Sequence, residues 1–258
     1  MGKKSSKKQI ALNYAKDVTS GKIIAGAEVV AACERFLRDI EREDLELRTK
    51  DPDVVIAIME QTMVHQQGED LEGHPLLGKP FKLQPWQVFI IYNLMGFWYK
   101  GTNNRRFKEA FIFIPRKNGK TSMIAALAWA VGILQRKSGS KIYIVANALK
   151  QTMEAFNFIK FSLDYNHLSD GCRIRDNNQE HSIGYQFKSD GKPAGSLEIN
   201  ALASNPDSQD SFNCNFAIAD EVAAYKKPKQ YTLFKDAQKS YRNKLMIGVT
   251  TAGDNANS

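Results

Sequence analysis

One stretch of the chain combines the parts that a phosphate-binding loop requires. The apolar run Phe111-Ile112-Phe113-Ile114 predicts a short buried strand, and Gly119-Lys120-Thr121 opens an apolar run that continues to Leu134. At the start of such a helix, backbone N–H groups point at one spot and carry partial positive charge. Lys120 can reach the β- and γ-phosphates of a nucleotide, and the Thr121 hydroxyl can hold Mg²⁺. Gly119 lets the backbone approach the phosphates without a Cβ in the way.

The loop departs from the common pattern at its first position, where Ile114 replaces Gly or Ala. The competing interpretation is an ordinary helix start that carries an incidental lysine. That interpretation leaves unexplained why Arg116, Lys117 and Lys120 converge on one anion-binding helix terminus. We therefore interpret the segment as a nucleotide-binding P-loop that takes ATP with Mg²⁺.

A second acidic element follows about a hundred residues later. The apolar run Cys214 to Ala219 predicts a strand that ends in Asp220-Glu221. Asp220 can orient a Mg²⁺-bound water beside Thr121, while Glu221 can position the attacking water and take its proton. An Asp-Glu pair after a strand is often only the opening of a loop. Its combination with an upstream P-loop is much more specific than either motif alone.

The predicted strand Lys244 to Val249 runs into Thr250-Thr251-Ala252-Gly253. Small hydroxyl residues at the C-terminal edge of a strand can hydrogen-bond to a γ-phosphate or to the glutamate that polarises water. The alternative is a tight turn that ends the domain.

Gln87 follows Pro85 at the predicted start of an amphipathic helix. A glutamine amide can both donate to and accept from the edge of adenine, so it can read that base. The alternative is an ordinary surface glutamine. The position ahead of the P-loop strand favours the adenine reader.

Composition sets broad limits. The 258 residues are enough for one large α/β domain, or for a core domain with a small appendage. The content of 43% hydrophobic and 25% charged residues is typical of a soluble globular protein. No apolar run has the ~20 residues of a membrane span, and the basic N-terminus lacks the apolar region of a secretory signal. The cysteines (Cys33, Cys172, Cys214) and histidines lack metal-ligand spacing. The net charge of +8 points weakly to a polyanionic partner.

The remaining patterns predict an α/β fold with a mainly parallel sheet. Residues 22–47 and a segment from Asp51-Pro52 predict helices, 141–146 a buried strand and 149–163 a helix. Residues 172–202 alternate in short segments typical of a β-hairpin insertion. Pro228 to Tyr241 predicts a further helix.

The order of these parts resembles the additional-strand, catalytic-glutamate class of P-loop ATPases. Within that class, the sequence is similar to the large terminase subunit of tailed double-stranded DNA phages, in the group related to phage HK97. The segments that carry the resemblance are Ala31 to Asp39, Pro85-Trp86-Gln87, Pro115 to Thr121, Ala219-Asp220-Glu221 and Thr250 to Gly253. In terminases the first glycine of the P-loop pattern is usually replaced, as it is by Ile114 in this chain.

The resemblance implies a role for each matching position. Gln87 would read adenine, Arg116 would stabilise the γ-phosphate, Thr121 and Asp220 would hold Mg²⁺, and Glu221 would activate water. Nucleotide contact is expected at Gln87, Pro115, Arg116, Lys117, Asn118, Gly119, Lys120, Thr121 and Ser122. The residues expected to act in catalysis are Glu221, Arg116 and Lys120. The residues expected to couple hydrolysis to movement are Thr250, Thr251, Ala252 and Gly253. Arg105, Arg106 and Arg136 are candidates for an arginine that acts on a neighbouring subunit.

The resemblance also implies domains and partners. It predicts a basic flexible tail at 1–20, a helical subregion at 21–80, an ATPase core at 81–253 and, at 254–258, the start of a linker to a C-terminal nuclease domain absent from this chain. The expected function is to move double-stranded DNA into a procapsid in the bacterial host cytoplasm. Expected partners are the portal protein, the small terminase subunit and further copies in a ring, without a membrane.

Three other functions remain open from the residues. A helicase is another DNA-dependent ATPase with the same motifs. A basic nucleic-acid-binding module with a defunct P-loop would bind nucleotide without turnover, and the joint presence of Lys120, Asp220 and Glu221 argues against it. A small-molecule kinase is the weakest of the three, because a water-activating glutamate would waste ATP.

Overall fold

The computed structural model describes residues 5–203 and 213–251. They pack as two units, the first containing residues up to 57 and 82–108, and the second containing 58–81 and those from 109 onward. The chain therefore passes from the first unit to the second and back before it enters the second again. This differs from the predicted single boundary between residues 80 and 81. Residues 58–81 belong with the second unit because Ser162 accepts a hydrogen bond from Val64 N at 3.2 Å, and the rings of Phe81 and Phe158 lie 5.7 Å apart.

The first unit is built from helices around an aromatic core. Its elements are α1 (Lys7–Thr19), α2 (Ala27–Glu41), β1 (Leu45–Leu47), the start of α3 (Lys50–Thr62), α4 (Pro85–Gly96) and β2 (Phe97–Tyr99), with β1 and β2 antiparallel. The Phe36 ring lies 5.2 Å from Phe89 and 5.4 Å from Phe97 between ring centroids. Helix α4 begins as predicted, with Pro85 at its first position and a capping box in front of it.

The structure corrects the prediction of a flexible basic tail at residues 1–20. Residues Lys7–Thr19 form α1, which the Ser6 side chain caps by accepting from Gln9 N at 3.2 Å. Ala11, Ala15 and Val18 are buried along one face of this helix. The pattern escaped notice because small apolar residues separated by lysine and polar residues make a weak stripe. The helix predicted over 22–47 is also shorter than expected: it ends at Glu41, and β1 follows.

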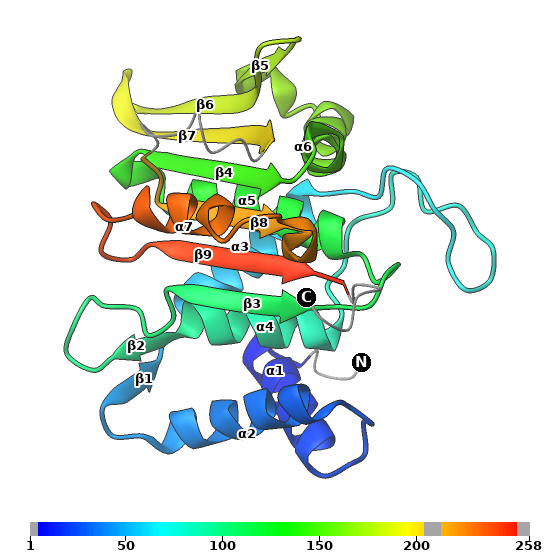
Figure 1. Cartoon of the computed structure of the whole chain (residues 1–258), viewed down its shortest axis with the longest axis vertical. Coiled ribbons are helices and arrows are strands. Elements are labelled where there is room, and N and C mark those ends of the chain that lie inside the picture. The colour runs from blue at the N-terminus through cyan, green and yellow to red at the C-terminus, as the bar shows by residue number, and fades with distance from the viewer. Residues whose placement is uncertain (1–4, 204–212, 252–258) are drawn as a thin grey trace. The chain divides into compact units, whose positions relative to one another are not determined.

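The second unit is organised around a mixed sheet (Figure 1). Its strands are β3 (Glu109–Phe113), β4 (Ser140–Ala146), β5 (Cys172–Asp176), β6 (His181–Ser189), β7 (Lys192–Ala203), β8 (Phe216–Asp220) and β9 (Leu245–Thr250). Their spatial order is β3-β9-β8-β4-β7-β6-β5. The strands from β3 to β7 in this order are parallel, while β6 and β5 pair antiparallel. The predicted mainly parallel α/β sheet with a hairpin insertion is confirmed.

Strand β9 lies between β3 and β8 and pairs in parallel with both. An extra strand between the P-loop strand and the acidic strand is the arrangement that names the additional-strand class. The C-terminal ends of β3, β9 and β8 consequently meet at one edge of the sheet, where ligands bind in open α/β folds. The predicted class is therefore confirmed.

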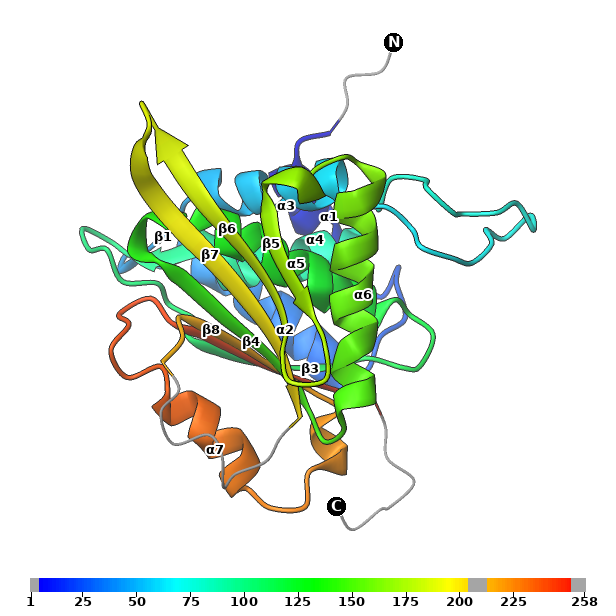
Figure 2. The same ribbon diagram turned by 90° about the horizontal axis from the view of Figure 1, so that it is seen from above.

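Helices cover both faces of this sheet. Helices α5 (Lys120–Leu134) and α6 (Leu149–Tyr165) lie on one face, and α7 (Lys229–Asp236) lies on the other (Figure 2). Tyr143 and Val145 of β4 and Ala217 and Ala219 of β8 form a buried cluster with Phe234 of α7. Burial on both faces explains why β4, β8 and β9 read as continuous apolar runs. Three short 3₁₀ turns complete the described elements: η1 (Arg136–Ser138), η2 (Ser169–Gly171) and η4 (Val222–Ala224).

Strand β3 differs from its predicted burial. The side chains of Phe111 and Phe113 are 61% and 60% exposed, while Ile112 and Ile114 are buried. The two phenylalanines share one face of this edge strand, and the two isoleucines lie on the opposite face. A run of four apolar residues conceals this alternation in the sequence.

A glycine in β7 sets how closely η1, the turn that follows α5, approaches this strand. Gly195 has a φ of 141°, and a Cβ built there would lie 2.5 Å from the Arg136 backbone oxygen. Gly191 has a φ of 74°, and a Cβ built on Gly191 would have no other atom within 4 Å. Gly191→Ala should lower the free energy of unfolding by about 1 kcal/mol through backbone strain, and Gly195→Ala by about 2–4 kcal/mol because a clash adds to it. Urea unfolding of both variants measures the difference, and equal losses would contradict this packing.

Candidate nucleotide-binding site

The loop between β3 and α5 has the backbone form of an anion-binding turn. Lys117 and Gly119 both adopt left-handed conformations, each with a φ of 66°. The Asn118 amide donates to the backbone oxygens of Pro115 and Arg116 at 3.2 Å, which fixes the loop from within. Gly119 caps α5 without a side-chain hydrogen bond, so the first N–H groups of the helix face outward. Alternating right- and left-handed residues in front of a helix concentrate N–H groups on one anion.

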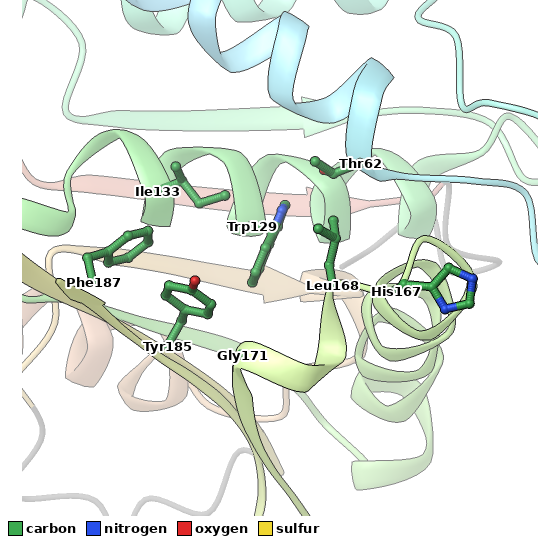
Figure 3. Close-up of a pocket in the computed structure, with 8 residues that line it drawn as sticks. All are labelled: Thr62, Trp129, Ile133, His167, Leu168, Gly171, Tyr185 and Phe187. Atoms are coloured by element: carbon green, nitrogen blue, oxygen red, sulfur yellow. The ribbon is translucent and has the colours of Figure 1, made fainter. Parts of the chain in front are cut away.

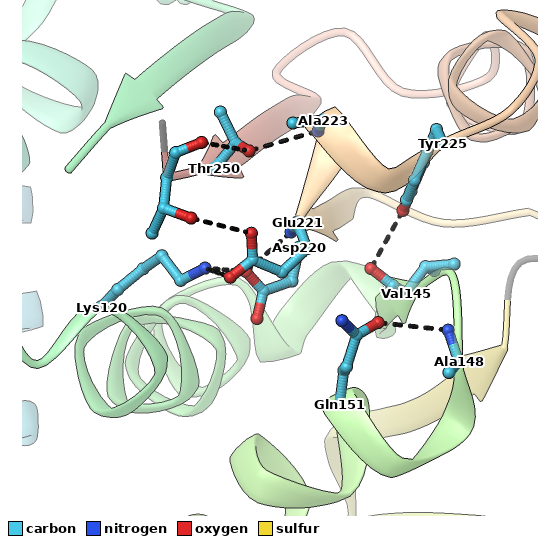
Figure 4. A network of polar contacts seen from close by, with 10 residues as sticks. Lys120, Val145, Ala148, Gln151, Asp220, Glu221, Ala223, Tyr225 and Thr250 are labelled. Carbon is cyan, nitrogen blue, oxygen red and sulfur yellow. Dashed lines mark hydrogen bonds and ion pairs between the residues drawn. The ribbon is translucent and has the colours of Figure 1, made fainter. Parts of the chain in front are cut away.

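Lys120 is the first residue of α5 and projects into a cluster of carboxylates (Figure 4). Its Nζ lies 3.0 Å from Asp220 Oδ1 and forms a shorter ion pair with Glu221 Oε1. The Lys120 side chain is 10% exposed and the Asp220 side chain 4% exposed. The cation and carboxylates predicted from two distant motifs thus meet in one buried group. Buried charges require this kind of pairing, because an isolated one would be strongly destabilising.

The two carboxylates have different surroundings. Asp220 ends the fully buried strand β8, and burial raises the pKa of its carboxyl group while the Lys120 ammonium opposes that rise. Glu221 has a left-handed φ of 51°, and its N–H donates to Asp220 Oδ1 at 2.9 Å. This turn points the Glu221 side chain, which is 28% exposed, away from the strand. One carboxylate is therefore held inside, and its neighbour can meet a water molecule.

The end of β9 connects the loop with the acidic pair. Ile114 N donates to the Thr250 backbone oxygen at 3.1 Å, and the Thr250 hydroxyl accepts from Ala223 N at 3.2 Å. The Thr251 hydroxyl donates to Glu221 Oε2 at 3.4 Å, a long and weak bond. The structure thus brings Thr250 and Thr251 beside Glu221, whereas Ala252 and Gly253 lie outside the described residues.

The other predicted nucleotide residues divide between the two units. Arg116 and Lys117 are exposed in the loop, and Thr121 and Ser122 are half-buried in the first turn of α5. Gln87 belongs to the first unit, where it is 4% exposed and its Oε1 accepts from Gln84 N at 2.8 Å. A glutamine oxygen can accept a second hydrogen bond and its amide nitrogen can donate, so the capping bond leaves capacity to read adenine.

The three arginines considered for action on a neighbouring subunit are all engaged within the chain. Arg105 is 1% exposed, and burial lowers the pKa of its guanidinium to about 10. Arg106 pairs with Asp39 at 3.0 Å. Arg136 donates to the Ile133 backbone oxygen at 2.9 Å and lies 5.3 Å from the centre of the Phe187 ring. The burial of Arg105 argues against a role for it outside its own unit.

Sequence reasoning missed the residues that hold the segment after Glu221. The Tyr225 hydroxyl donates to the Val145 backbone oxygen at 3.1 Å, which attaches this segment to β4 (Figure 4). A tyrosine a few residues beyond an Asp-Glu pair carries no local pattern that would mark it. In the same view, Gln151 accepts from Ala148 N at 3.2 Å and caps the start of α6. Tyr225 can attach the segment after β8 to β4 because these two strands are neighbours in the sheet.

The donor set fits Mg²⁺ bound together with nucleotide phosphates. Proteins hold Mg²⁺ through one or two carboxylates completed by phosphate oxygens and water. Asp220 is a buried carboxylate that already accepts a cation, since Lys120 Nζ lies 3.0 Å away. Among the described residues, no group of three His, Cys, Asp or Glu side chains could hold a metal ion.

A cavity of about 340 Å³ lies apart from the loop (Figure 3). Its walls are mostly aromatic and aliphatic: Thr62, Trp129, Ile133, His167, Leu168, Gly171, Tyr185 and Phe187. Trp129 and Ile133 lie in the later turns of α5, roughly 14–20 Å along the helix from Lys120 at about 1.5 Å per residue. The cavity contains none of the predicted nucleotide-binding residues.

The fold and this site define the architecture of an additional-strand P-loop ATPase. Strand β3, the loop and the helix that begins at Lys120 follow one another, and β8, which ends in Asp220, is separated from β3 by β9. The family model for the terminase large subunit, ATPase domain, matches residues 85–258. The chain belongs to this family. None of the described helices is long and apolar enough to cross a membrane.

The fold is similar to that of a solved terminase structure. The crystal structure of the HK97 bacteriophage large terminase aligns with a TM-score of 0.59 and 22% sequence identity, over 77% of this chain and 37% of that chain. A mutant of the ATPase domain of the Thermus phage P74-26 large terminase aligns with a TM-score of 0.45 and 16% identity, over 61% of this chain and 68% of that chain. A search of curated proteins found no match. The chain thus corresponds to little more than a third of the HK97 protein.

The two threonines at the end of β9 should differ in their effect on stability. Thr250→Val leaves the Ala223 N–H without its acceptor and should lower the free energy of unfolding by about 1–2 kcal/mol. Thr251→Val removes the long bond to Glu221 and should cost less than about 0.5 kcal/mol. Both side chains are buried, so the pair is matched for volume and exposure. Urea unfolding in the absence of nucleotide tests this order, and the reverse order would contradict the contacts.

Proposed function

We propose that the chain is the ATP-hydrolysing motor portion of a phage terminase large subunit, which drives double-stranded DNA into a procapsid. The observation that carries the proposal is the ion group in which Lys120, at the start of α5, meets Asp220 and Glu221 at the end of β8. This group combines a phosphate-binding cation, a metal-binding carboxylate and a water-activating carboxylate. Family membership supports the assignment of ATP hydrolysis to these residues.

The loop would bind the nucleotide phosphates through its backbone. N–H groups of the left-handed turn and of the α5 N-terminus would surround the β-phosphate. Lys120 would turn from its carboxylate partners to the β- and γ-phosphates, and Arg116, exposed in the same loop, would stabilise charge on the γ-phosphate. Pro115, Lys117, Asn118, Gly119 and Ser122 would complete the cradle.

Asp220 and Thr121 would hold Mg²⁺ beside the phosphates. The ion would supply charge neutralisation to the β- and γ-phosphate oxygens during transfer. Asp220 suits this position, since its buried carboxylate already pairs with a cation. The Thr121 hydroxyl in the first turn of α5 supplies a neutral oxygen ligand.

Glu221 would activate water once Lys120 has moved. In the present arrangement the Lys120 ammonium pairs with Glu221 Oε1, so this carboxylate oxygen is already occupied by a cation. Transfer of Lys120 to the phosphates releases Glu221 to orient a water molecule in line with the γ-phosphorus and take its proton. The Thr251 hydroxyl would keep the carboxylate in position. Nucleotide binding would thus switch on the general base.

Strand β9 would carry the result of hydrolysis to the rest of the chain. Its end contacts the P-loop through Ile114 and the segment after Glu221 through Ala223. Thr250 to Gly253 would therefore respond when the γ-phosphate leaves. The proposed partners are double-stranded DNA, the portal protein, the small terminase subunit and further copies of the chain in a ring, all in the bacterial host cytoplasm. A nuclease function would belong to a separate domain.

Glu221→Gln tests the central step. Turnover of ATP should fall by roughly 10²–10⁴-fold, because the general base is removed. ATP binding should remain or tighten, because Lys120 loses a competing carboxylate. Steady-state hydrolysis and the dissociation constant for ATP measure the two effects. Glu34→Gln, which neutralises an exposed carboxylate of the first unit, is the matched control.

Two results would contradict the proposal. Near-normal turnover by Glu221→Gln would remove the assignment of the base, and ATP binding without turnover by the parent chain at every concentration would favour a non-hydrolysing binding module. A faster-than-linear rise of turnover with protein concentration supports a ring. Separation of strands on a forked duplex, in place of movement along an intact duplex, would favour a helicase.

Gln87→Ala tests the adenine reader. Loss of the amide should shrink the preference for ATP over GTP by about tenfold, which corresponds to about 1.4 kcal/mol and is typical of one hydrogen bond. The ratio of kcat/KM for the two nucleotides measures it. Gln84→Ala removes the other half of the same capping box and should leave the preference unchanged. An equal effect of both variants would show that Gln87 acts only by holding the helix start.

A further inference from the structure

Three lysines lie within four consecutive positions in the segment that follows the acidic pair. Lys226 and Lys227 lie between η4 and α7, Lys229 is the first residue of α7, and all three are exposed; we call this segment the lysine loop. Within the described residues, none of the three has a carboxylate within 4.0 Å, which is the reach of an ion pair. By contrast, Lys235 in the following helix pairs with Glu109 at 2.7 Å. The loop thus carries positive charge that the described part of the chain does not neutralise.

The backbone of this lysine loop is held in one conformation. The Gln230 side chain is 6% exposed, and its Oε1 accepts from Lys226 N at 2.8 Å and from Lys227 N at 3.1 Å. Gln230 N donates back to the Lys227 backbone oxygen at 3.0 Å. Pro228 restricts the backbone further. The lysine side chains make none of these bonds. They project from a pre-formed turn, so binding of a partner does not require the backbone of this turn to be ordered first.

The lysine loop is connected directly to the predicted hydrolytic residue. Ala224 N donates to the Glu221 backbone oxygen at 2.8 Å, and Ala223 N donates to Thr250. Tyr225, the residue before the loop, is anchored to β4 through the Val145 oxygen at 3.1 Å. A displacement of Glu221 would consequently be passed along a short hydrogen-bonded segment to Lys226.

The position of the loop suits an extended partner. In Figure 2 the orange segment that links η4 to α7 runs along the margin of the second unit, outside the sheet. A nucleotide or other small anion requires a recess that surrounds it, whereas all three lysines stand exposed. A row of point charges on an open surface suits the phosphate backbone of a nucleic acid duplex, which presents a line of negative charges.

We infer that Lys226, Lys227 and Lys229 contact the phosphate backbone of double-stranded DNA and move with Glu221 during hydrolysis. The inference rests on the proposed function and adds to it a DNA-contacting surface. The contact is made to phosphates alone, so it is independent of base sequence and sensitive to salt. Each phosphate neutralised contributes about 0.9 to the slope of log affinity against log salt concentration.

The test compares two triple variants of equal charge change. Lys226→Gln/Lys227→Gln/Lys229→Gln removes the loop charges, and Lys8→Gln/Lys16→Gln/Lys100→Gln removes three exposed lysines of the first unit. Binding to a duplex of random sequence is measured from low to moderate salt, together with ATP hydrolysis with and without DNA. Thermal unfolding checks that both variants are folded.

The loop variant should bind DNA at least about tenfold more weakly, with a salt slope reduced by about 2–3. It should lose stimulation of hydrolysis by DNA and keep the DNA-free rate of the parent chain. The control variant should retain most of the affinity and the stimulation. Equal losses in the two variants would overturn the inference, because they would reflect net charge alone.

Other outcomes separate the inference from the proposed function. An unchanged salt slope in the loop variant, with DNA binding by the parent chain intact, would overturn only the lysine contact. A fall in the DNA-free rate that depends on protein concentration would reassign the lysines to the nucleotide of a neighbouring copy. Hydrolysis by the parent chain without any DNA binding would overturn the DNA motor and the lysine contact together.

Discussion

The buried ion group of Lys120, Asp220 and Glu221 is the interaction on which the arrangement of the site depends. Lys120 and Asp220 have little access to water, whereas Glu221 is 28% exposed, so removal of Lys120 would leave the buried Asp220 carboxylate without its cation. The group exists only because β8 ends beside the start of α5, at the same edge of a parallel sheet. It also makes the site responsive, because a nucleotide presents the phosphate charges that can draw Lys120 away from its carboxylates.

Strand β9 converts this local pairing into a connected site. Its place between β3 and β8 lets one strand end touch both the P-loop and the segment after Glu221. A change at the phosphates can therefore reach the acidic turn through backbone and hydroxyl contacts, without passing through a flexible segment. The apolar packing on both faces of β4, β8 and β9 makes this central part rigid, so small displacements are transmitted rather than absorbed. Beyond the acidic turn, the lysine loop is the next element along the chain.

The two units contribute in different ways to the expected chemistry. The second unit contains the P-loop, the acidic pair and the end of β9, whose contacts are direct. The first unit contains Gln87 at the capped start of α4 and the buried Arg105, whose guanidinium donates to Met95 Sδ at 2.9 Å. Charge that is buried or paired in the first unit is unavailable to partners, whereas the exposed basic residues near the acidic turn are available. The net charge of +8 does not tell which basic residues are buried or paired and which are exposed.

The sequence by itself determined the strand–loop–helix at residues 111–134, the Asp220-Glu221 strand end and the class of fold, because these features are local and have characteristic residue types and order. It did not reveal α1, whose small apolar residues are hidden among lysines, or the exposure of Phe111 and Phe113, because a run of four apolar residues conceals which of them face outward. The pairing of Lys120 with Glu221, the attachment of Tyr225 to β4 and the burial of Arg105 were decided by tertiary structure alone. Each depends on contacts between segments far apart in the chain, and such contacts are set by how strands and helices pack and not by any local pattern.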